Sequence, residues 1–326
     1  MIYNTQNKSI LTNFIKKIKR HKKSSYNLSF KNAELLYNII LKGKLSDIEL
    51  GAFLLAMRIK GESVEEISGF LNAINSLFIP LEIPISKYAP IIIPSYNGSR
   101  RFMNVIPLLA LLLSKKGIPV FIHGIKKNFG RITTYEILKK LGYFAVSSKK
   151  KAIKYLKLKR LVFMDISILI PELSKLLEIY YMLGIRNSSH LLVKIIQPLS
   201  IPALRLVSYT HPEYLKILSD YFYNEKSLGD IFLMQGTEGE VIPNICNSKQ
   251  IIHWFHDNKY TKLTKEQNKE ISFPKNSNIN DNVLWIQSVL DNKLPIPSTI
   301  INQVKNCILI SRMLSLKYSN TISNKI

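Results

Sequence analysis

Five cationic side chains stand in two loops that each follow a short apolar run. Ile91–Ile93 stops at Pro94 before a polar turn, and Ile118–Ile122 ends at His123. We expect a strand–helix–strand unit over residues 91–131, with both loops at the carboxyl ends of parallel strands, where open α/β sheets bind ligands. These loops contain no acidic residue, so they predict a site for an anion. The cations are Arg100, Arg101, Lys126, Lys127 and Arg131.

The densest basic segment of the chain lies at residues 143–160. A helix there would place Lys150, Lys154 and Lys157 on one face, at spacings of four and three residues. The segment either is a solvated surface or contacts phosphates, and the same two readings apply to the amphipathic, basic residues 10–25. The lysines that we assign to phosphate contacts are Lys149, Lys150, Lys151, Lys154 and Lys157.

The net charge favours an anionic partner. The 326 residues include 46 Lys and Arg against 22 Asp and Glu, a formal net charge of +24. The abundance of Lys, Ile and Asn resembles an A/T-rich coding bias, which would raise the lysine content without selection for charge. That bias does not readily explain the shortage of acidic residues, so we favour a functional charge of the kind that nucleic-acid-binding proteins carry.

Two cysteines make neither a disulfide framework nor a metal site, which suits a reducing compartment. The first residues are polar and then basic, without the apolar stretch of a secretory signal. The longest apolar runs, such as Val105–Leu113, are too short to cross a bilayer. We expect a soluble cytoplasmic protein, with association with the nucleoid as an option and no membrane partner.

The order of patterns predicts an α/β protein with two domains. Residues 1–83 read as a small helical bundle in which two capping boxes, Ser46 to Glu49 and Ser63 to Glu66, open helices. Later helices could pack on that bundle. Residues 84–326 read as a large α/β domain with a mainly parallel central sheet, with helices at 171–183 and 191–198, a strand-terminal loop at 236–240 and an irregular surface segment at 258–282.

Several segments together resemble one family, glycosyltransferase family 3, which contains the anthranilate phosphoribosyltransferases and pyrimidine nucleoside phosphorylases. They are LSDIELGAFLLAMRIKGESVEEISG, PSYNGSRRFMNVIPLLALLLSKKGIPVFIHG, GRITTYEILKKLG, RNSSHLLVKIIQP, LRLVSYTHPEYL and QGTEGE. They are most similar to the TrpD2 branch, described as DNA-binding proteins of YbiB type. The resemblance covers about residues 28–256. It implies a helical domain that makes a homodimer, joined by hinges to an α/β domain.

The chain departs from the motifs with which the catalytic family holds its phosphorylated donor. Where the family has Gly-Thr-Gly-Gly-Asp, this chain has the segment from Tyr96 to Arg100, with one glycine and no aspartate. After Asn104 the two phosphate-binding hydroxyls are missing, and the Lys-His-Gly-Asn motif keeps only His123 and Gly124. The metal-binding Asp-Glu pair is replaced by Glu238 and Glu240, separated by a glycine. We therefore expect phosphoribosyl transfer to be lost, with no catalytic residue and no resident metal or cofactor.

The same resemblance defines a vestigial ligand site. Arg186, Asn187 and His190 match the region that holds the aromatic acceptor, and they either bind a small ligand or cap a helix. His123 is read as a structural remnant, and Glu238 and Glu240 as residues that order a loop rather than hold a metal. Other members of this site are Tyr96, Gly98, Ser99, Asn104 and Gly124.

We expect the protein to bind DNA or RNA without sequence preference through Asn97, Arg100, Arg101, Arg131 and the lysines already named. Tyr96, Phe102 and Phe129 either stack on bases or belong to the core. One alternative is a pentosyltransferase that uses a phosphorylated ribose and Mg²⁺. A second is a scaffold for an acidic protein partner.

Overall fold

A computed structural model describes residues 11–16, 26–84, 86–225, 227–244, 249–257, 259–266 and 278–323. The chain forms two compact units. The first comprises Met1–Ile79 and Ile170–Ile196, and the second Pro80–Leu169 and Gln197–Ile326. The basic residues expected on a helix at 10–25 lie outside the described part of the chain from position 17 onward. Among the described residues, none of the helices combines the length and apolar composition that a membrane span requires.

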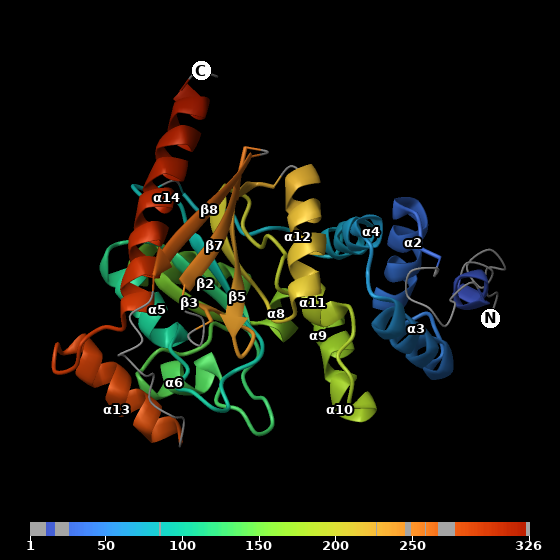
Figure 1. Cartoon of the computed structure of the whole chain (residues 1–326), viewed down its shortest axis with the longest axis horizontal. Helices are drawn as coiled ribbons and strands as arrows, with labels where there is room; N and C mark the ends of the chain where they lie inside the picture. The colour runs from blue at the N-terminus through green and yellow to red at the C-terminus, as the bar shows by residue number, and fades with distance from the viewer. Residues whose placement is uncertain are drawn as a thin grey trace. The chain divides into compact units, whose positions relative to one another are not determined.

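The first unit is built of helices. They are α2 (Phe30–Leu41), α3 (Asp47–Lys60), α4 (Val64–Asn75), α9 (Pro171–Glu178), α10 (Tyr180–Leu183) and α11 (Ser189–Leu192) (Figure 1). Both predicted capping boxes are formed, at Ser46 with Glu49 and at Ser63 with Glu66. The helix expected at 191–198 is wrong: α11 spans only Ser189–Leu192, and turns follow it ahead of Pro198, which has no N–H group with which to continue a helix.

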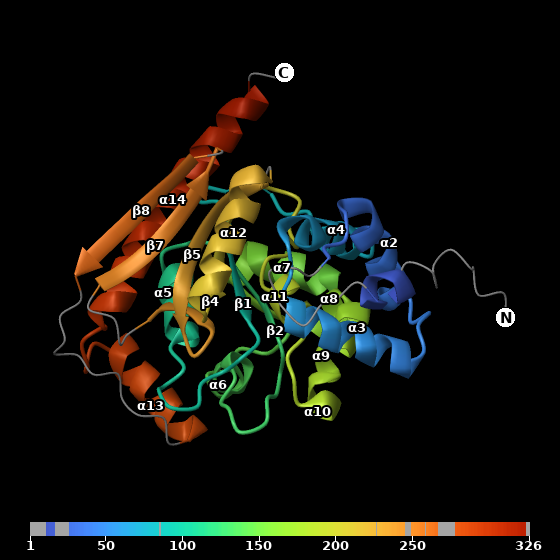
Figure 2. The ribbon, with the colours of Figure 1, turned by 45° about the vertical axis from the view of Figure 1, so that its right-hand side comes forward.

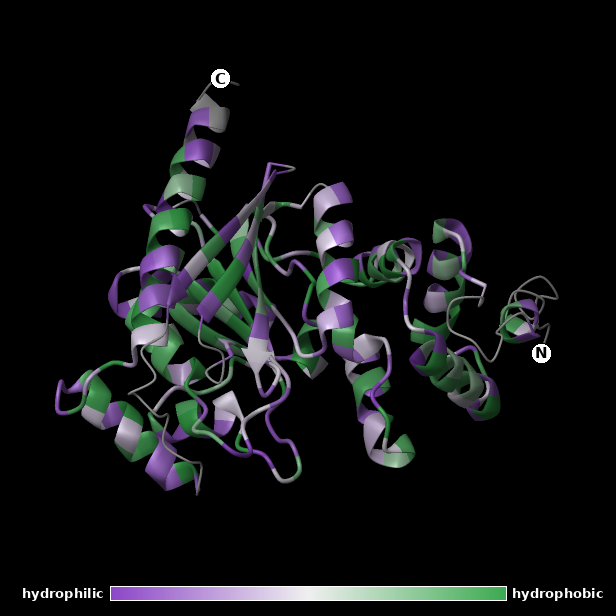
Figure 3. Cartoon of the chain, in the orientation of Figure 1, coloured by the Kyte–Doolittle hydropathy of each residue, from purple (hydrophilic) through white to green (hydrophobic). Residues whose placement is uncertain are grey.

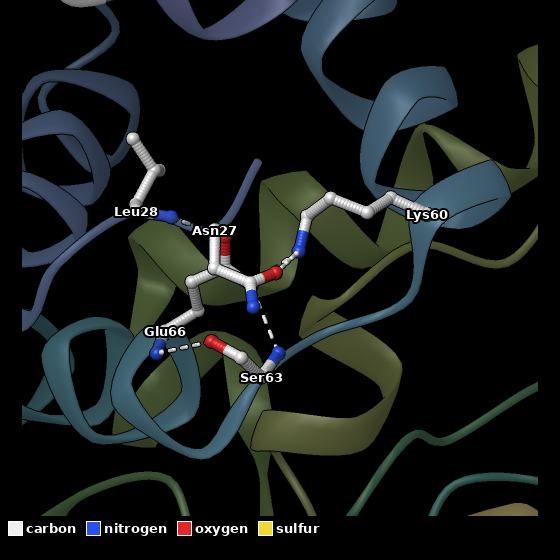
Figure 4. A network of polar contacts seen from close by, with 5 residues as sticks. All are labelled: Asn27, Leu28, Lys60, Ser63 and Glu66. Carbon is white, nitrogen blue, oxygen red and sulfur yellow. Dashed lines mark hydrogen bonds and ion pairs between the residues drawn. The ribbon is translucent and has the colours of Figure 1, made fainter. Parts of the chain in front are cut away.

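A buried ion pair joins three segments of this unit (Figure 4). The Glu66 carboxylate accepts hydrogen bonds from Lys60 Nζ at 2.6 Å, from Ser63 N at 2.8 Å and from Leu28 N at 2.8 Å. Lys60 Nζ also donates to Asn27 Oδ1 at 2.8 Å. Lys60 is 4% exposed and Glu66 is fully buried, so the two charges depend on each other for solvation.

Replacing one partner of this pair should destabilise the helical unit strongly. Glu66→Gln leaves the Lys60 ammonium buried without a carboxylate, and we expect it to lower the free energy of unfolding by about 3–5 kcal/mol. Glu65→Gln changes the same charge at an exposed position of the same helix and should cost less than about 0.5 kcal/mol. Amide hydrogen exchange within α2 and α4 measures the loss locally; equal exchange rates in the two variants would contradict this role.

The second unit is built on one sheet with the strand order β3-β2-β1-β4-β5-β7-β8, and β6 pairs with β5 (Figure 2). The strands β1 to β5 pair with one another in parallel, whereas every pairing of β6, β7 and β8 is antiparallel. Their bounds are β1 Ile91–Ser95, β2 Val120–Gly124, β3 Leu161–Asp165, β4 Ala203–Tyr209, β5 Gly229–Thr237, β6 Glu240–Pro243, β7 Lys249–His256 and β8 Lys259–Glu266. The predicted fold class is confirmed.

Helices cover both faces of this sheet. They are α5 (Ile106–Lys115), α6 (Thr134–Lys140), α7 (Lys149–Lys159), α8 (Ile166–Leu169), α12 (Pro212–Asn224), α13 (Ile279–Leu290) and α14 (Ser298–Ser323). α5 and α14 lie on one face and α12 on the other (Figure 1). Apolar residues fill the strands between them, while polar residues gather on the outer helix surfaces (Figure 3).

Two expectations about the sheet are wrong. Part of the segment predicted as irregular, Lys259–Glu266, is an edge strand paired with β7 along its whole length. The strand was not recognised in the sequence because its outer edge is polar and carries lysines. Edges of this kind protect sheets against pairing with further strands. The predicted loop at 236–240 is instead a tight hairpin, because Gly236 and Thr237 still belong to β5 and Glu240 begins β6.

Candidate functional site

Two glutamates of the β5–β6 hairpin fill the loop that follows β1. Glu240 Oε1 accepts hydrogen bonds from Asn97 N at 2.9 Å and Gly98 N at 2.7 Å. The Glu238 carboxylate accepts from Arg100 N at 2.9 Å and from Arg101 N at 3.0 Å. Successive backbone N–H groups of this kind form a concave binding site for an anion. Here the bound anions are carboxylates of the same chain.

The β5–β6 hairpin packs closely against the loop that follows β1. Glu238 has a φ of +51°, and a Cβ at Gly239 would lie 1.9 Å from Asn97 Nδ2, so only glycine fits there. Ser208 Oγ donates to the Gly239 carbonyl at 2.8 Å and ties the hairpin to β4. The two carboxylates are therefore fixed against the loop by the sheet itself.

The loop after β2 is bonded to the loop after β1. Asn128 Nδ2 donates to Asn97 O at 2.7 Å, and Arg131 Nη1 donates to Gly98 O at 3.2 Å. The Ser99 and Ile132 backbones bond to each other in both directions, at 2.9 and 2.8 Å. The two loops predicted to share a site are therefore brought together.

Asn104 anchors both loops to the helices behind them. Its Nδ2 donates to Ile132 O at 3.1 Å and to Thr134 Oγ1 at 3.2 Å, and its N donates to Asn282 Oδ1 at 2.9 Å. Ser95 Oγ, at the end of β1, also donates to Thr134 Oγ1, at 2.8 Å. Asn104 is 1% exposed, so its polar atoms serve the fold and are closed to a ligand.

Tyr96 and His123 form a buried pair below the loops. The Tyr96 hydroxyl is hydrogen-bonded to His123 Nδ1 at 2.7 Å. Burial lowers the pKa of His123 to about 3 and raises the pKa of Tyr96 well above its usual value, with the nearby Asp165 adding to the second effect. Both side chains are therefore uncharged at neutral pH. The next residue, Gly124, has to be a glycine, because a Cβ at this position would lie 2.0 Å from Ser95 O.

Asp165, the last residue of β3, was not predicted to belong to the site. The register places Ser95 beside Gly124 and Gly124 beside Asp165, so the three strands end together. Asp165 Oδ2 lies 4.0 Å from Lys126 Nζ, and its Oδ1 caps α8 by accepting from Ser167 N at 2.9 Å. The two loops themselves contain no acidic residue, but three carboxylates from other segments, Asp165, Glu238 and Glu240, lie beside them.

Cationic side chains form the outer surface of the two loops. Arg100, Arg101, Lys126 and Lys127 are exposed, and Phe129 between them is 86% exposed. Arg131 is half-buried through its bond to Gly98, and Asn97 is 2% exposed beneath the surface. Of the aromatic side chains considered for base stacking, Tyr96 is buried and Phe102 packs against the core. Only Phe129 of the three reaches solvent freely.

The lysine helix α7 begins at the same edge of the sheet. Val146 pairs with Met164 near the end of β3, and α7 then runs back to Arg160, which leads directly into β3. Lys150, Lys151, Lys154 and Lys157 are exposed, while Lys149 is half-buried. The first turn thus carries Lys149–Lys151 at the positive end of the helix dipole, with Ser148 Oγ accepting from Lys151 N at 3.2 Å. Lys157 lies toward the opposite edge.

Arg186, Asn187 and His190 belong to the helical unit. Asn187 Nδ2 donates to Leu176 O at 2.9 Å, and its Oδ1 accepts from Ser189 N at 2.9 Å, which starts α11. Burial and the charge of Arg186 lower the pKa of His190 to about 3. Within this unit Asn187 acts as a helix cap.

Comparisons with known proteins agree with this architecture. Residues 12–77 match the model described as "Glycosyl transferase family, helical bundle domain". The chain is 35% identical to the uncharacterized Escherichia coli K12 protein YbiB over 297 residues, which are 90% of this chain and 92% of YbiB. The chain belongs to glycosyltransferase family 3, the family of the anthranilate phosphoribosyltransferases.

Other members of glycosyltransferase family 3 are more distant. Saccharolobus solfataricus anthranilate phosphoribosyltransferase is 30% identical over 223 residues, 66% of this chain and 61% of that enzyme. The crystal structure of the Thermus thermophilus enzyme matches 95% of this chain and 90% of its own, with a TM-score of 0.70 at 16% identity. The Saccharomyces cerevisiae enzyme in complex with PRPP and Mg matches with a TM-score of 0.69 at 17% identity, over 95% of this chain and 90% of its own.

The loop junction offers a test with an internal control. Gly98 and Gly130 have nearly the same φ, +67° and +68°, but a Cβ at Gly98 would lie 2.7 Å from Ile132 O, whereas one at Gly130 would meet nothing within 4 Å. We expect Gly130→Ala to cost about 1–2 kcal/mol from backbone strain alone. Gly98→Ala should cost about 2 kcal/mol more, because the two loops must separate. Urea denaturation measures both; equal costs would contradict the junction.

Proposed function

We propose that the protein binds nucleic acid without sequence preference, through the cationic surface formed by Arg100, Arg101, Lys126, Lys127 and the exposed lysines of α7. The observation that carries this proposal is that the backbone and the side chains of the loop after β1 have different partners. Its backbone N–H groups are bonded to Glu238 and Glu240, while the side chains of Arg100 and Arg101 remain in solvent. Exposed guanidinium and ammonium groups are the usual contacts to nucleic-acid phosphates.

The lysine helix supports the same proposal. Three lysines in the first turn of α7 face the positive end of the helix dipole, and the first turn holds no acidic residue. This arrangement costs helix stability when nothing is bound, since like charges repel. A phosphate at that end would be favoured by the lysines and by the dipole together.

A phosphoribosyl transfer is less well supported by the same geometry. Glu238 and Glu240 stand where the family carries its metal-binding pair, but each directs oxygens at backbone N–H groups. Among the residues that the structure describes, no three His, Cys, Asp or Glu side chains gather as a metal site. These carboxylates do not fit Mg²⁺, and we propose that the chain has no resident metal and no transferase activity.

The binding proposal is tested by a salt series. Fluorescence anisotropy with labelled single- and double-stranded DNA of unrelated sequences should show affinities that fall steeply with salt. The double variant Arg100→Ala/Arg101→Ala should reduce the slope of log K against log salt by about 2, since each phosphate contact contributes about 1. A triple substitution of Lys150, Lys151 and Lys154 by alanine should weaken binding further.

Lys115→Ala/Lys116→Ala is the matched control, because these exposed lysines end α5 at the amino edge of the sheet. The control removes the same charge as the arginine pair and should leave the slope nearly unchanged. A wild-type slope near zero, or equal effects of both pairs, would overturn the proposal. A pull-down with and without nuclease distinguishes nucleic-acid binding from a scaffold for acidic proteins: if nucleic acid mediates the contacts, co-purifying proteins are lost after nuclease treatment. Stabilisation of the protein by PRPP with Mg²⁺ would favour the transferase.

We also propose that the helical unit forms a homodimer through α3. Ile48, Leu55 and Ile59 lie seven and four residues apart, on one face of that helix, and they are 85%, 49% and 57% exposed. A monomer rarely leaves such a continuous apolar stripe in water. Two subunits would double the number of cationic surfaces and increase the avidity for a long polyanion.

The substitution of Leu55 and Ile59 by aspartate should convert the dimer into a monomer, because each new charge would be desolvated at the interface. Sedimentation equilibrium measures the mass directly. Leu158→Asp introduces one such charge at an exposed apolar position of α7, outside the helical unit, and should leave the mass unchanged. A wild-type monomer at micromolar concentration would refute this arrangement.

A further inference from the structure

A cavity lies at the edge of the sheet opposite the cationic loops. It has a volume of about 580 Å³ and opens where β4 and β5 begin, beside Pro202 and Gly229. The end of β7, the end of α12 and the last turns of α14 enclose it. A volume of this size is typical of sites for small molecules.

Asp230 is the polar group most deeply set in this cavity. Its side chain lines the cavity although the residue is only 8% exposed. Oδ2 accepts a hydrogen bond from Trp254 Nε1 at 2.9 Å, and Oδ1 has no hydrogen-bond partner in the described part of the chain. Burial raises the pKa of Asp230. A carboxylate oxygen that lines a cavity and has no donor in the described part of the chain can accept a hydrogen bond from a ligand that brings one.

The other residues that line the cavity indicate the chemical character of the rest of the ligand. Phe222 and Phe255 lie with ring centroids 5.8 Å apart on one side, and Tyr318 and Leu314 line another. Glu225 and Asp257 are the further carboxylates, and Lys317, which is paired with Asp257, is the one lysine among the described lining residues. Among the described lining residues three carboxylates outnumber one lysine, and aromatic and apolar side chains make up much of the rest, although the chain carries +24.

We propose that this cavity binds a small organic cation: a primary ammonium or guanidinium group that donates to Asp230 Oδ1, on an apolar or aromatic body that packs between the phenylalanines. The faces of aromatic rings attract cations, and a desolvated carboxylate strengthens that attraction. The carboxylates of the described lining repel a phosphate, and its one lysine is already paired with Asp257. The site is therefore chemically distinct from the cationic loops and from any nucleic-acid contact.

Isothermal titration calorimetry of the full-length protein with three isosteric probes tests this proposal. 2-Phenylethylamine carries the cation, 2-phenylethanol is neutral, and 3-phenylpropionate is an anion of similar size. We expect the amine to bind at least tenfold more tightly than the alcohol, and the acid to show no binding. Asp230→Asn keeps an acceptor for Trp254 but removes the charge, and it should weaken the amine at least tenfold.

Two further variants serve as a charge control and as an independent test of the cavity. Asp291→Asn removes one negative charge at an exposed position away from the cavity and should not change the affinity for the amine. Leu228→Trp fills the cavity from its 42% exposed rim without a change of charge and should also abolish binding, even if Asp230→Asn fails to fold. Absence of amine binding to the wild type, equal binding of all three probes, or full binding to Asp230→Asn or Leu228→Trp would overturn the proposal.

Discussion

The hydrogen bonds from the loop after β1 to Glu238 and Glu240 determine the organisation of the ligand edge of the sheet. A backbone N–H group bonded to a carboxylate contributes about 1.5–3 kcal/mol, more than a bond between neutral groups. The glutamates lie on a hairpin that Ser208 ties to β4, so they are permanently present at the loop. A phosphate would have to displace two intramolecular anions, which act at a high effective concentration.

The surface chemistry follows from that internal bonding. Once the loop is held from below by carboxylates and from the side by Asn128 and Arg131, its exposed side chains are those of Arg100 and Arg101. Long flexible cations recognise a row of phosphates without reading bases, since phosphate contacts position a protein and carry no sequence information. The backbone N–H groups of the loop are already bonded to carboxylates, and the two arginine side chains extend toward solvent, where a larger anion can reach them. This is the physical basis of the function that we propose.

Local patterns in the sequence predicted the elements that depend on neighbouring residues. The capping boxes at Ser46 and Ser63, the strand–helix–strand unit and the lysine helix were all correct, because each is specified within a few residues. The meeting of the two loops followed from a general rule for parallel sheets. Asp165 could have been found by the same rule, since it is the last residue of a buried apolar run.

The remaining contacts join segments that the sequence gives no reason to pair. Glu240 bonds Gly98 across 142 positions and Asn282 bonds Asn104 across 178, and neither contact has a local signature. The strand β8 was read as irregular because an edge strand with a polar outer surface lacks the apolar alternation that identifies inner strands. Asn97 looked like a surface contact, but its burial depends on Gly239 from the distant hairpin.

Site-resolved amide hydrogen exchange of the loop after β1, in the protein without any ligand, is the most direct measurement. We expect the N–H groups of Asn97, Gly98, Arg100 and Arg101 to be strongly protected in the wild type. In Glu238→Ala/Glu240→Ala they should lose most of that protection, while the amides of β1 keep theirs. Rapid exchange in the unliganded wild type, or equal protection in the double variant, would contradict the claim that the chain fills its own anion site.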